Sequence, residues 1–270
     1  MNRKGIKAAA KQSLKEAGPS VRRITLIFLL AIWVLAAANW GVELLEERMA
    51  AGGGHLSDMV SAQTRAFVLG VVISLVLQMA AVLLAMGYGA LGLRISRREE
   101  FSARTLLEGF SSWGRGILLY LLSSLLLSLW GMLLTMPLSY ILATAYVLEL
   151  ITMDQAVWIL TGLMAVAMAI WSYRYRMAWF ILIDRPELSA RQVLSQAKQV
   201  NRGSRVRIFL LDLSFLPWML LCAVTLGIAG IWKLPYLVTA YAQAYNAMLV
   251  QAEDRQRRTQ ELIRQRNMQM

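Results

Sequence analysis

The chain has 270 residues, of which 58% are hydrophobic and 16% are charged, with a mean hydropathy of +0.52 and a formal net charge of +12. A soluble basic domain does not combine such hydropathy with such charge, and here the charges lie in short blocks between long apolar runs. We therefore expect a membrane protein and no nucleic-acid partner. The single Cys222 and the single His55 leave no internal disulfide and no Cys/His cluster, so we expect neither metal nor cofactor.

Six apolar segments were judged against the roughly 20 helical residues that cross a hydrocarbon core about 30 Å thick. They are residues 24–40, 67–93, 117–146, 156–183, 208–232 and 234–250. The third is too long for one straight span, and Pro137 is where we expect it to kink or end. The sequence therefore predicts an all-α, polytopic transmembrane helix bundle. Residues 1–250 form a single integral membrane domain, and residues 251–270 form a charged cytoplasmic tail.

Lysine and arginine indicate the orientation of these spans. With six crossings and both termini in the cytoplasm, all but three of the 28 basic residues fall on the inner side, and the exceptions are Arg48, Arg65 and Lys233. The outer loops instead hold acidic residues, namely Glu43, Glu46, Glu47, Asp58, Glu149 and Asp154. The positive-inside rule then predicts a multi-pass protein of the cell membrane with cytoplasmic termini. Residues 36–38 resemble a signal-peptide cleavage site, but we favour an uncleaved first span, because cleavage would remove the most basic inner segment.

Three polar stretches have apolar side chains at helical spacing. In the basic N-terminal stretch, residues 1–18, these are Ile6, Ala10 and Leu14. In the second stretch, which spans Ser189 to Gly203 with Leu188 directly before it, they are Leu188, Val193, Leu194 and Val200. We predict both stretches as amphipathic helices on the cytoplasmic membrane surface. In the tail only Leu262 and Ile263 interrupt the mixed charges, and there we favour a solvated connector over a helix.

Three charged residues lie within or near the ends of apolar segments. Asp212 is inside the fifth segment, and Arg174 and Arg176 lie near the inner end of the fourth. An isolated charge in the acyl region costs a few kcal/mol. We therefore predict that Asp212 pairs with Arg174 or Arg176. Contacts of snorkelled side chains with headgroups are a second structural explanation, and a proton or ion relay is the functional alternative.

The last apolar segment has a polar stripe formed by Tyr236, Thr239, Gln243 and Asn246. Polar side chains at this density should face the bundle or a watery cavity rather than lipid. We favour contacts between helices over a substrate path. Together with Arg174, Arg176 and Asp212, these residues are our candidate intramembrane polar cluster.

Residues 87–92 read Gly-Tyr-Gly-Ala-Leu-Gly and match the dinucleotide-binding fingerprint to the letter. The match lies at the end of an apolar helix with no preceding strand, so we assign no nucleotide site. Small residues instead favour close helix packing, and we predict it along the stripe Ala81, Ala85 and Gly89.

Several elements in the second half of the chain share an order and spacing that are typical of one family. They are Tyr173–Ala178 (Tyr-Arg-Tyr-Arg-Met-Ala), Ile181-Leu182, Asp184–Ser189 (Asp-Arg-Pro-Glu-Leu-Ser), Lys198, Gly203, Phe209-Leu210, Leu213–Phe215, Trp218, Gly227-Ile228, Trp232, Pro235-Tyr236 and Tyr245. From Tyr173 to the tail the chain resembles the bacterial integral membrane proteins catalogued as domain of unknown function 975. It departs from the family where Val166–Ala169 replaces a proline-glycine pair and Ala197 a serine. The resemblance implies a multi-span plasma-membrane protein and no activity.

Seven basic residues are our candidates for contacts with anionic lipid headgroups: Arg94, Arg97, Arg98, Lys198, Arg202, Arg205 and Arg207. The chain has no zincin, P-loop or G-x-S-x-G motif, so we do not expect an enzyme. We expect a protein that organises lipid or a protein partner, including a second copy of itself, at the cytoplasmic face. The alternative is a small permease or exporter subunit that uses the polar face of the last span.

Overall fold

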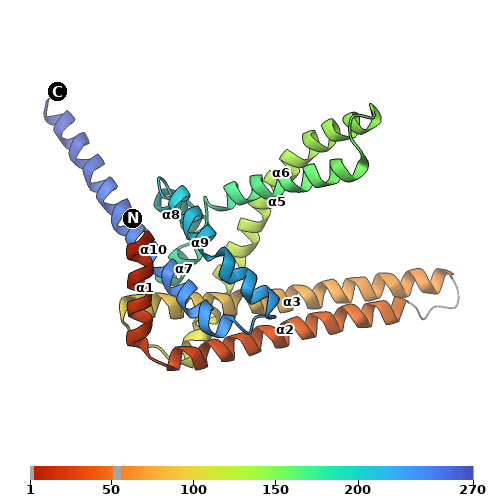
Figure 1. Ribbon diagram of the computed structural model, residues 1–270, viewed down its shortest axis with the longest axis horizontal. Coiled ribbons are helices and arrows are strands. Elements are labelled where there is room, and N and C mark those ends of the chain that lie inside the picture. The colour runs from red at the N-terminus through yellow and green to blue at the C-terminus, as the bar shows by residue number, and fades with distance from the viewer. Residues whose placement is uncertain (1–2, 51–55, 270) are drawn as a thin grey trace. The chain divides into compact units, whose positions relative to one another are not determined.

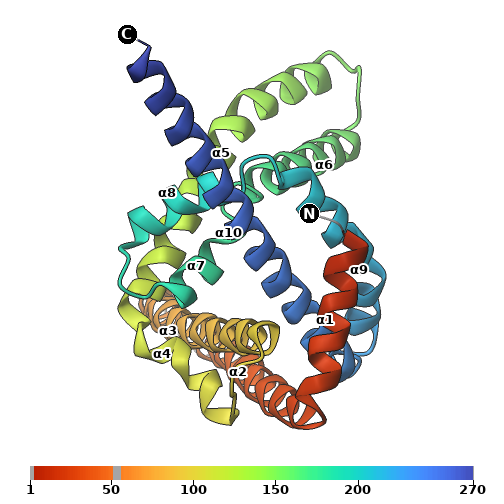
Figure 2. The same ribbon diagram turned by 90° about the vertical axis from the view of Figure 1, so that its left-hand side faces the viewer.

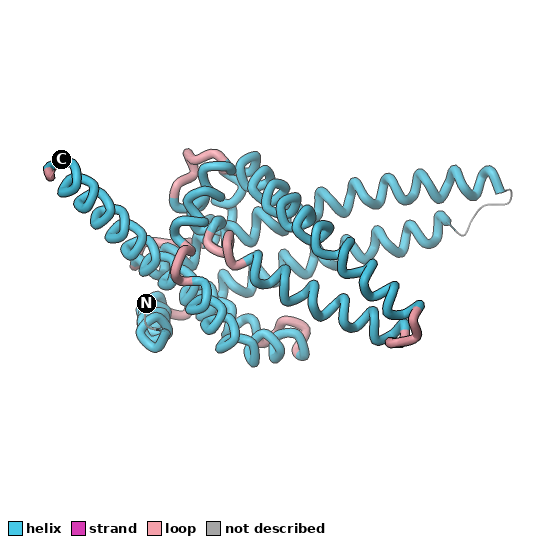
Figure 3. The backbone as a smooth tube through the Cα atoms, turned by 90° about the horizontal axis from the view of Figure 1, so that it is seen from above, coloured by secondary structure: helices cyan, strands magenta, loops and turns pink. Residues whose placement is uncertain are grey.

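The computed structural model describes residues 3–50 and 56–269, and every regular element in these two ranges is helical (Figure 1, Figure 2). In chain order the elements are α1 (Arg3–Ala17), α2 (Ser20–Ala50), α3 (Leu56–Arg97), the 3-10 helix η1 (Ala103–Leu107), α4 (Glu108–Ser111), α5 (Trp113–Val147), α6 (Met153–Ser172), α7 (Ala178–Asp184), α8 (Ala190–Val200), α9 (Arg205–Val224) and α10 (Gly230–Met268). Apart from α2 and α3, whose connection lies outside the described residues, successive helices are joined by short loops (Figure 3). The predicted all-α class is confirmed.

Five of the described helices are long and apolar enough to cross a membrane. The segments are Ser20–Leu45, Phe67–Arg97, Trp113–Val147, Met153–Ser172 and Arg205–Val224. Large apolar side chains on these segments, such as Val34, Val76 and Leu133, are exposed. Such a surface suits lipid rather than water, because exposed apolar area of this extent is rare on soluble monomers. These features are those of a multi-span membrane protein.

The sixth predicted span, residues 234–250, lies in α10, which is not among these five helices. Its polar stripe lowers the hydropathy of the segment. Ala240, Ala244 and Tyr245 are fully buried by protein. A helix that is covered by its neighbours does not need the apolar surface that lipid demands. A sixth crossing therefore stays a prediction.

Three predicted segment ends differ from the structure. α5 continues through Pro137, so the proline does not end this helix. The fourth predicted span, residues 156–183, divides into α6, a turn and α7, and the fifth ends early, at Val224. Leu226 (φ +50°) and Gly227 (φ +89°) both adopt positive φ in the turn that closes α9, where the N–H of Leu226 donates to the Ala223 carbonyl (3.1 Å) and that of Gly227 to the Cys222 carbonyl (2.6 Å). The apolar residues on both sides of this turn explain why hydropathy did not reveal it.

The polar stretches are all helical. α1 and α8 are helices as predicted, but protein covers their apolar faces, as the burial of Ile6, Ala10, Val193 and Ala197 shows. These faces are therefore not free to lie on a membrane surface. The tail is solvated as expected, since residues 253–269 are exposed, but it is not an irregular connector, because α10 continues without a break to Met268. Alternating charges at helical spacing support a helix without an apolar face.

The predicted outer loop between the first two spans is described only in part. Glu43, Glu47 and Arg48 lie in the last turns of α2. His55 and the side chains of Glu46 and Asp58 lie outside the described residues.

The described residues group into two compact units. One contains residues 118–214 and 244–269 with Arg3, and the other contains residues 4–117 and 215–243. α5, α9 and α10 each contribute residues to both units.

In the unit that contains residues 4–117, α2 packs along α3, and the two helices lie side by side in both ribbon views (Figure 1, Figure 2). The core between them and η1 consists of Val21, Ile24, Phe28, Tyr88, Leu91, Ile95 and Leu106. The rings of Phe28 and Tyr88 stack with their centroids 4.3 Å apart. The Thr25 hydroxyl lies 3.0 Å from that of Tyr88, so the buried phenol has a hydrogen-bond partner.

Two glycines let η1 and α4 lie directly against α3. A Cβ at Gly87 would overlap the carbonyl oxygen of Leu106, and a Cβ at Gly109 would overlap the carbonyl oxygen of Leu83. Only hydrogen fits at either position, so the two backbones touch. The stripe predicted for close packing is wrong, because Ala85 at its centre is exposed. The contact forms with a short connecting segment, on another face of α3.

Candidate functional site

The Tyr-Arg-Tyr-Arg block forms the turn between α6 and α7. After Ser172 the backbone bonds shorten to three-residue steps: Arg174 N–H donates to the Trp171 carbonyl (3.0 Å), and Tyr175 N–H donates to the Ser172 carbonyl (3.0 Å). Ala178 N–H closes the turn on the Tyr175 carbonyl (2.9 Å). The turn places aromatic and cationic side chains at the end of an apolar span, where a bilayer has its polar interface.

Asp212 of α9 lies against this turn. Arg176 Nη2 is 3.1 Å from Asp212 Oδ2, and the Tyr173 hydroxyl donates to the same oxygen at 2.7 Å. The predicted ion pair is therefore confirmed, with Arg176 as the partner. Burial, together with the hydrogen bond to Asp212, raises the pKa of Tyr173 to about 12, and Arg176 lowers it in part. Tyr173 thus keeps its proton and acts as the donor.

Arg174 does not share in this pair. Its guanidinium carbon lies 5.0 Å from the centroid of the Trp171 ring, a cation–π contact. Its carbonyl accepts a hydrogen bond from Asn201 Nδ2 (3.0 Å), and Asn201 is fully buried. Within the described part of the chain no carboxylate pairs with Arg174. Three buried polar atoms here have no hydrogen-bond partner in the protein: Trp171 Nε1, Arg174 Nε and Asn201 Oδ1.

Sequence reasoning found the two arginines of this turn but missed Trp171, Tyr173 and Asn201. A signal for the aromatic residues was available, because Trp and Tyr are enriched where a span meets the membrane interface. Asn201 had no such signal, because it reaches the turn from the end of α8.

An apolar groove lies between α5 and α6, further from this end of the span. Leu134, Pro137, Leu138 and Ile141 of α5 line it together with Leu163, Met164 and Ala167 of α6. Leu134, Ile141 and Leu163 are exposed, so the groove opens to the surroundings of the two helices. Between the groove and the turn, the Trp130 and Trp171 rings pack with their centroids 4.0 Å apart.

The polar stripe of α10 is engaged inside the protein. Thr239 is fully buried, and its hydroxyl donates to the Pro235 carbonyl (2.7 Å). Gln243 Nε2 donates to Ser13 Oγ of α1 (3.3 Å) and to the Ser96 carbonyl of α3 (3.1 Å). Gln243 therefore joins three helices that are far apart in the sequence, which is the role in helix contacts that we favoured.

The seven residues of the predicted cluster fall in both compact units. Arg174, Arg176, Asp212 and Asn246 belong to the unit with residues 118–214, and Tyr236, Thr239 and Gln243 belong to the other. Asn246 is half-buried, and the ring of Tyr236 meets that of Phe215 edge-on with centroids 5.5 Å apart. Over the described ranges, no three His, Cys, Asp or Glu side chains come together as metal ligands.

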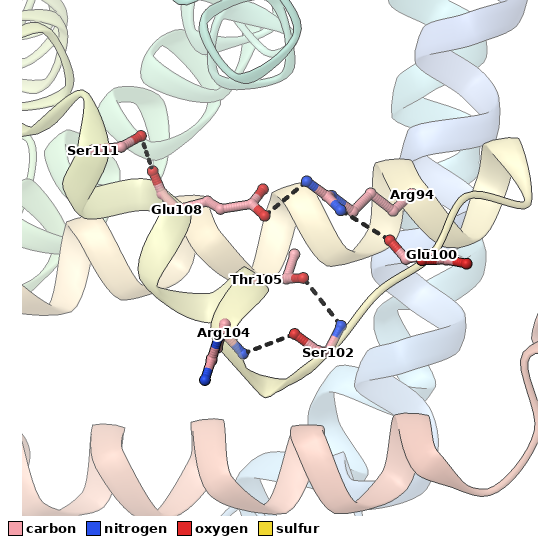
Figure 4. A network of polar contacts seen from close by, with 7 residues as sticks. All are labelled: Arg94, Glu100, Ser102, Arg104, Thr105, Glu108 and Ser111. Atoms are coloured by element: carbon pink, nitrogen blue, oxygen red, sulfur yellow. Dashed lines mark hydrogen bonds and ion pairs between the residues drawn. The ribbon is translucent and has the colours of Figure 1, made fainter.

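The candidate lipid contacts at the end of α3 face acidic groups. Arg94 Nη2 lies 2.7 Å from Glu108 Oε1, and its Nη1 donates to the Glu100 carbonyl (2.9 Å) beside the Ser102 cap of η1 (Figure 4). Arg98 Nε lies 2.8 Å from Glu16 Oε2. Arg97 is exposed. Because carboxylates already offset the charges of two of these three arginines, this group is a weaker candidate for anionic lipid than the sequence indicated.

The candidates at the junction of α8 and α9 are different. Lys198, Arg202, Arg205 and Arg207 are all exposed, and no carboxylate among the described residues pairs with them. Lys198 Nζ lies 5.7 Å from the Tyr175 ring centroid, and the carbonyl of Arg202 accepts a hydrogen bond from Arg255 Nη1. The membrane span of α9 begins at Arg205. These four cations therefore lie at or just before the start of an apolar helix.

A family described as protein of unknown function (DUF975) matches residues 1–252. The chain belongs to this family. The match extends over the first half as well, beyond the C-terminal elements on which the resemblance rested. Nothing among curated proteins and nothing among solved structures matches the chain.

Proposed function

We propose that this member of the DUF975 family is a non-enzymatic protein of the cell membrane that binds anionic phospholipid at its cytoplasmic face and organises the lipid around it. The supporting observation is the group of exposed cations without acidic partners at the start of α9, Lys198, Arg202, Arg205 and Arg207. A basic residue near an anionic membrane surface contributes about 1 kcal/mol, so the four together offer at most about 4 kcal/mol, reduced by salt.

The distribution of basic residues along the chain supports lipid binding at the cytoplasmic side of the membrane. With α10 as a sixth crossing and both termini inside, all but three of the 28 basic residues share one side. Anionic lipids in the cytoplasmic leaflet attract basic residues that lie near the membrane surface. The orientation and the lipid preference therefore rest on one electrostatic argument.

A permease that uses α10 receives less support. Thr239 and Gln243, two of the four polar residues that would line its path, donate hydrogen bonds within the protein. A transported solute would have to replace these bonds, at a cost of roughly 1 kcal/mol for each.

Native mass spectrometry with mixtures of phosphatidylglycerol and phosphatidylcholine tests the proposal. The wild-type chain should retain phosphatidylglycerol in preference, and Lys198→Gln combined with Arg202→Gln, Arg205→Gln and Arg207→Gln should remove most of this preference. The matched control changes the same net charge in the tail through Arg257→Gln, Arg258→Gln, Arg264→Gln and Arg266→Gln. No preference in the wild type, or an equal loss in both quadruple variants, would contradict the proposal.

A further inference from the structure

We infer that the α5–α6 hairpin holds one anionic phospholipid, with its phosphate at Trp171 and Arg174 and one acyl chain in the groove beside Pro137. The inference rests on the proposed function, because it takes the lipid class from there and gives it a defined site. The site differs from the cations at the start of α9, which offer charge without a pocket.

The polar end of the site is built from atoms that lack partners. Trp171 Nε1 and Arg174 Nε are buried N–H donors without an acceptor. Buried donors in native proteins are nearly always paired, so two in contacting side chains indicate a missing acceptor. A phosphate diester has two non-bridging oxygens that share one negative charge, and both accept hydrogen bonds from such donors. The third unpartnered atom, Oδ1 of Asn201, is fully buried beneath the same turn, so the site does not depend on it.

The charge of the turn also matches this ligand. Asp212 offsets Arg176, whereas no described carboxylate offsets Arg174. The turn and its Asp212 partner therefore carry one net positive charge. A phosphatidylglycerol headgroup carries one negative charge and free hydroxyl groups.

The groove lies in line with the turn. Ala167 and Trp171 are four residues apart, so they share one face of α6, with Trp171 about 6 Å nearer the interface at 1.5 Å per residue. Leu163 lies one further turn away on the same face. A lipid whose phosphate is at Trp171 would thus enter the groove with the upper part of an acyl chain.

The Arg174 side chain now lies over the Trp171 ring, so binding of the phosphate requires this side chain to turn away from the ring. The rotation is about single bonds and gives up one cation–π contact. A charge-assisted hydrogen bond to phosphate is the stronger interaction of the two.

The test is a titration of the full-length protein with phosphatidylglycerol, followed by native mass spectrometry in a background of phosphatidylcholine. One phosphatidylglycerol molecule should remain bound when the rest has been displaced. Arg174→Gln removes the charge and Ala167→Phe fills the groove, and each should weaken this retained lipid at least tenfold. The matched controls, Arg191→Gln on α8 and Ala165→Phe on another face of α6, should leave it unchanged.

The outcomes separate the two proposals. If phosphatidylglycerol is preferred but no single molecule is retained, or if Ala167→Phe and Arg174→Gln both leave the retained molecule in place, the inference is wrong and the proposed function stands. If the wild type shows no preference for phosphatidylglycerol, both are wrong. Displacement of the retained lipid by millimolar inorganic phosphate would show a free-phosphate site and overturn the inference. Arg174→Gln and Ala167→Phe act at opposite ends of the site. If one of these variants misfolds, the other still tests the inference.

Discussion

Asp212→Asn isolates the charge of the ion pair between α9 and the turn after α6. The amide oxygen can still accept the hydrogen bond from the Tyr173 hydroxyl, whereas the charge opposite Arg176 is lost. The Asp212 side chain is 16% exposed and that of Arg176 is 40% exposed, so the pair is intermediate between a surface and a buried ion pair. Exposed pairs contribute about 0.2 to 1 kcal/mol, and breaking a buried pair costs about 3 to 5 kcal/mol.

We therefore expect a coupling free energy of about 1 kcal/mol between positions 176 and 212. Asp212→Ala should cost more, about 2 to 3 kcal/mol, because both Tyr173 and Arg176 then lose their acceptor. Tyr173→Phe should cost about 1 kcal/mol, the value of one hydrogen bond.

The measurement is a double-mutant cycle of Asp212→Asn and Arg176→Gln, with unfolding followed during titration with dodecyl sulfate in mixed micelles. Arg207→Gln, an exposed residue of the same helix, is the control and should change stability by less than about 0.5 kcal/mol. A coupling free energy within about 0.3 kcal/mol of zero would refute the reasoning. Asp212 would then be the first residue to examine for proton-linked transport.

Further predictions concern packing and orientation. Gly109→Ala should destabilise the protein by about 2 kcal/mol or more in thermal unfolding, because its Cβ would overlap a carbonyl of α3. The control Gly114→Ala has open space around it and should be neutral. Equal effects of the two substitutions would contradict the packing of α4 on α3. Gln243→Leu should lower the free energy of unfolding by about 1 to 2 kcal/mol, because it removes the hydrogen bonds to α1 and α3. An unchanged melting temperature would show that Gln243 is not held by these bonds and would favour its role in transport. In a Cys222→Ser background, a cysteine at position 149 should react with an impermeant maleimide on intact cells and one at position 202 only after lysis; the reverse pattern would overturn the orientation.

Sequence reasoning succeeded where one local physical requirement decides the structure. Apolar runs located the five helices that can cross a membrane, and helical spacing located α1 and α8. Ser189 followed by Gln192 forms the capping box that starts α8. The depth of Asp212 required a partner, and Arg176 was near enough in the predicted topology to supply it.

It failed where the decisive contact is not local. Hydropathy indicates which residues suit lipid, but it does not indicate where the backbone turns. It therefore did not predict the turn at Gly227 or the end of α6 at Ser172, because both lie within apolar runs. The partner of Arg98, Glu16, is 82 residues away in the sequence. The contact at Gly87 could not be foreseen, because it depends on how the short segment η1–α4 folds back on α3.

The position of α1 has a consequence for the order of events during synthesis. Two of its partners are synthesised some two hundred residues after it: Gln243, which donates a hydrogen bond to Ser13, and Phe215, whose ring centroid lies 4.8 Å from Lys7 Nζ. Until then α1 lacks these two contacts. During this interval a lysine-rich amphipathic helix can bind to the membrane surface through its apolar face and its basic residues. The basic face of α1 thus suits a segment that is translated well before the residues that hold it in the folded protein.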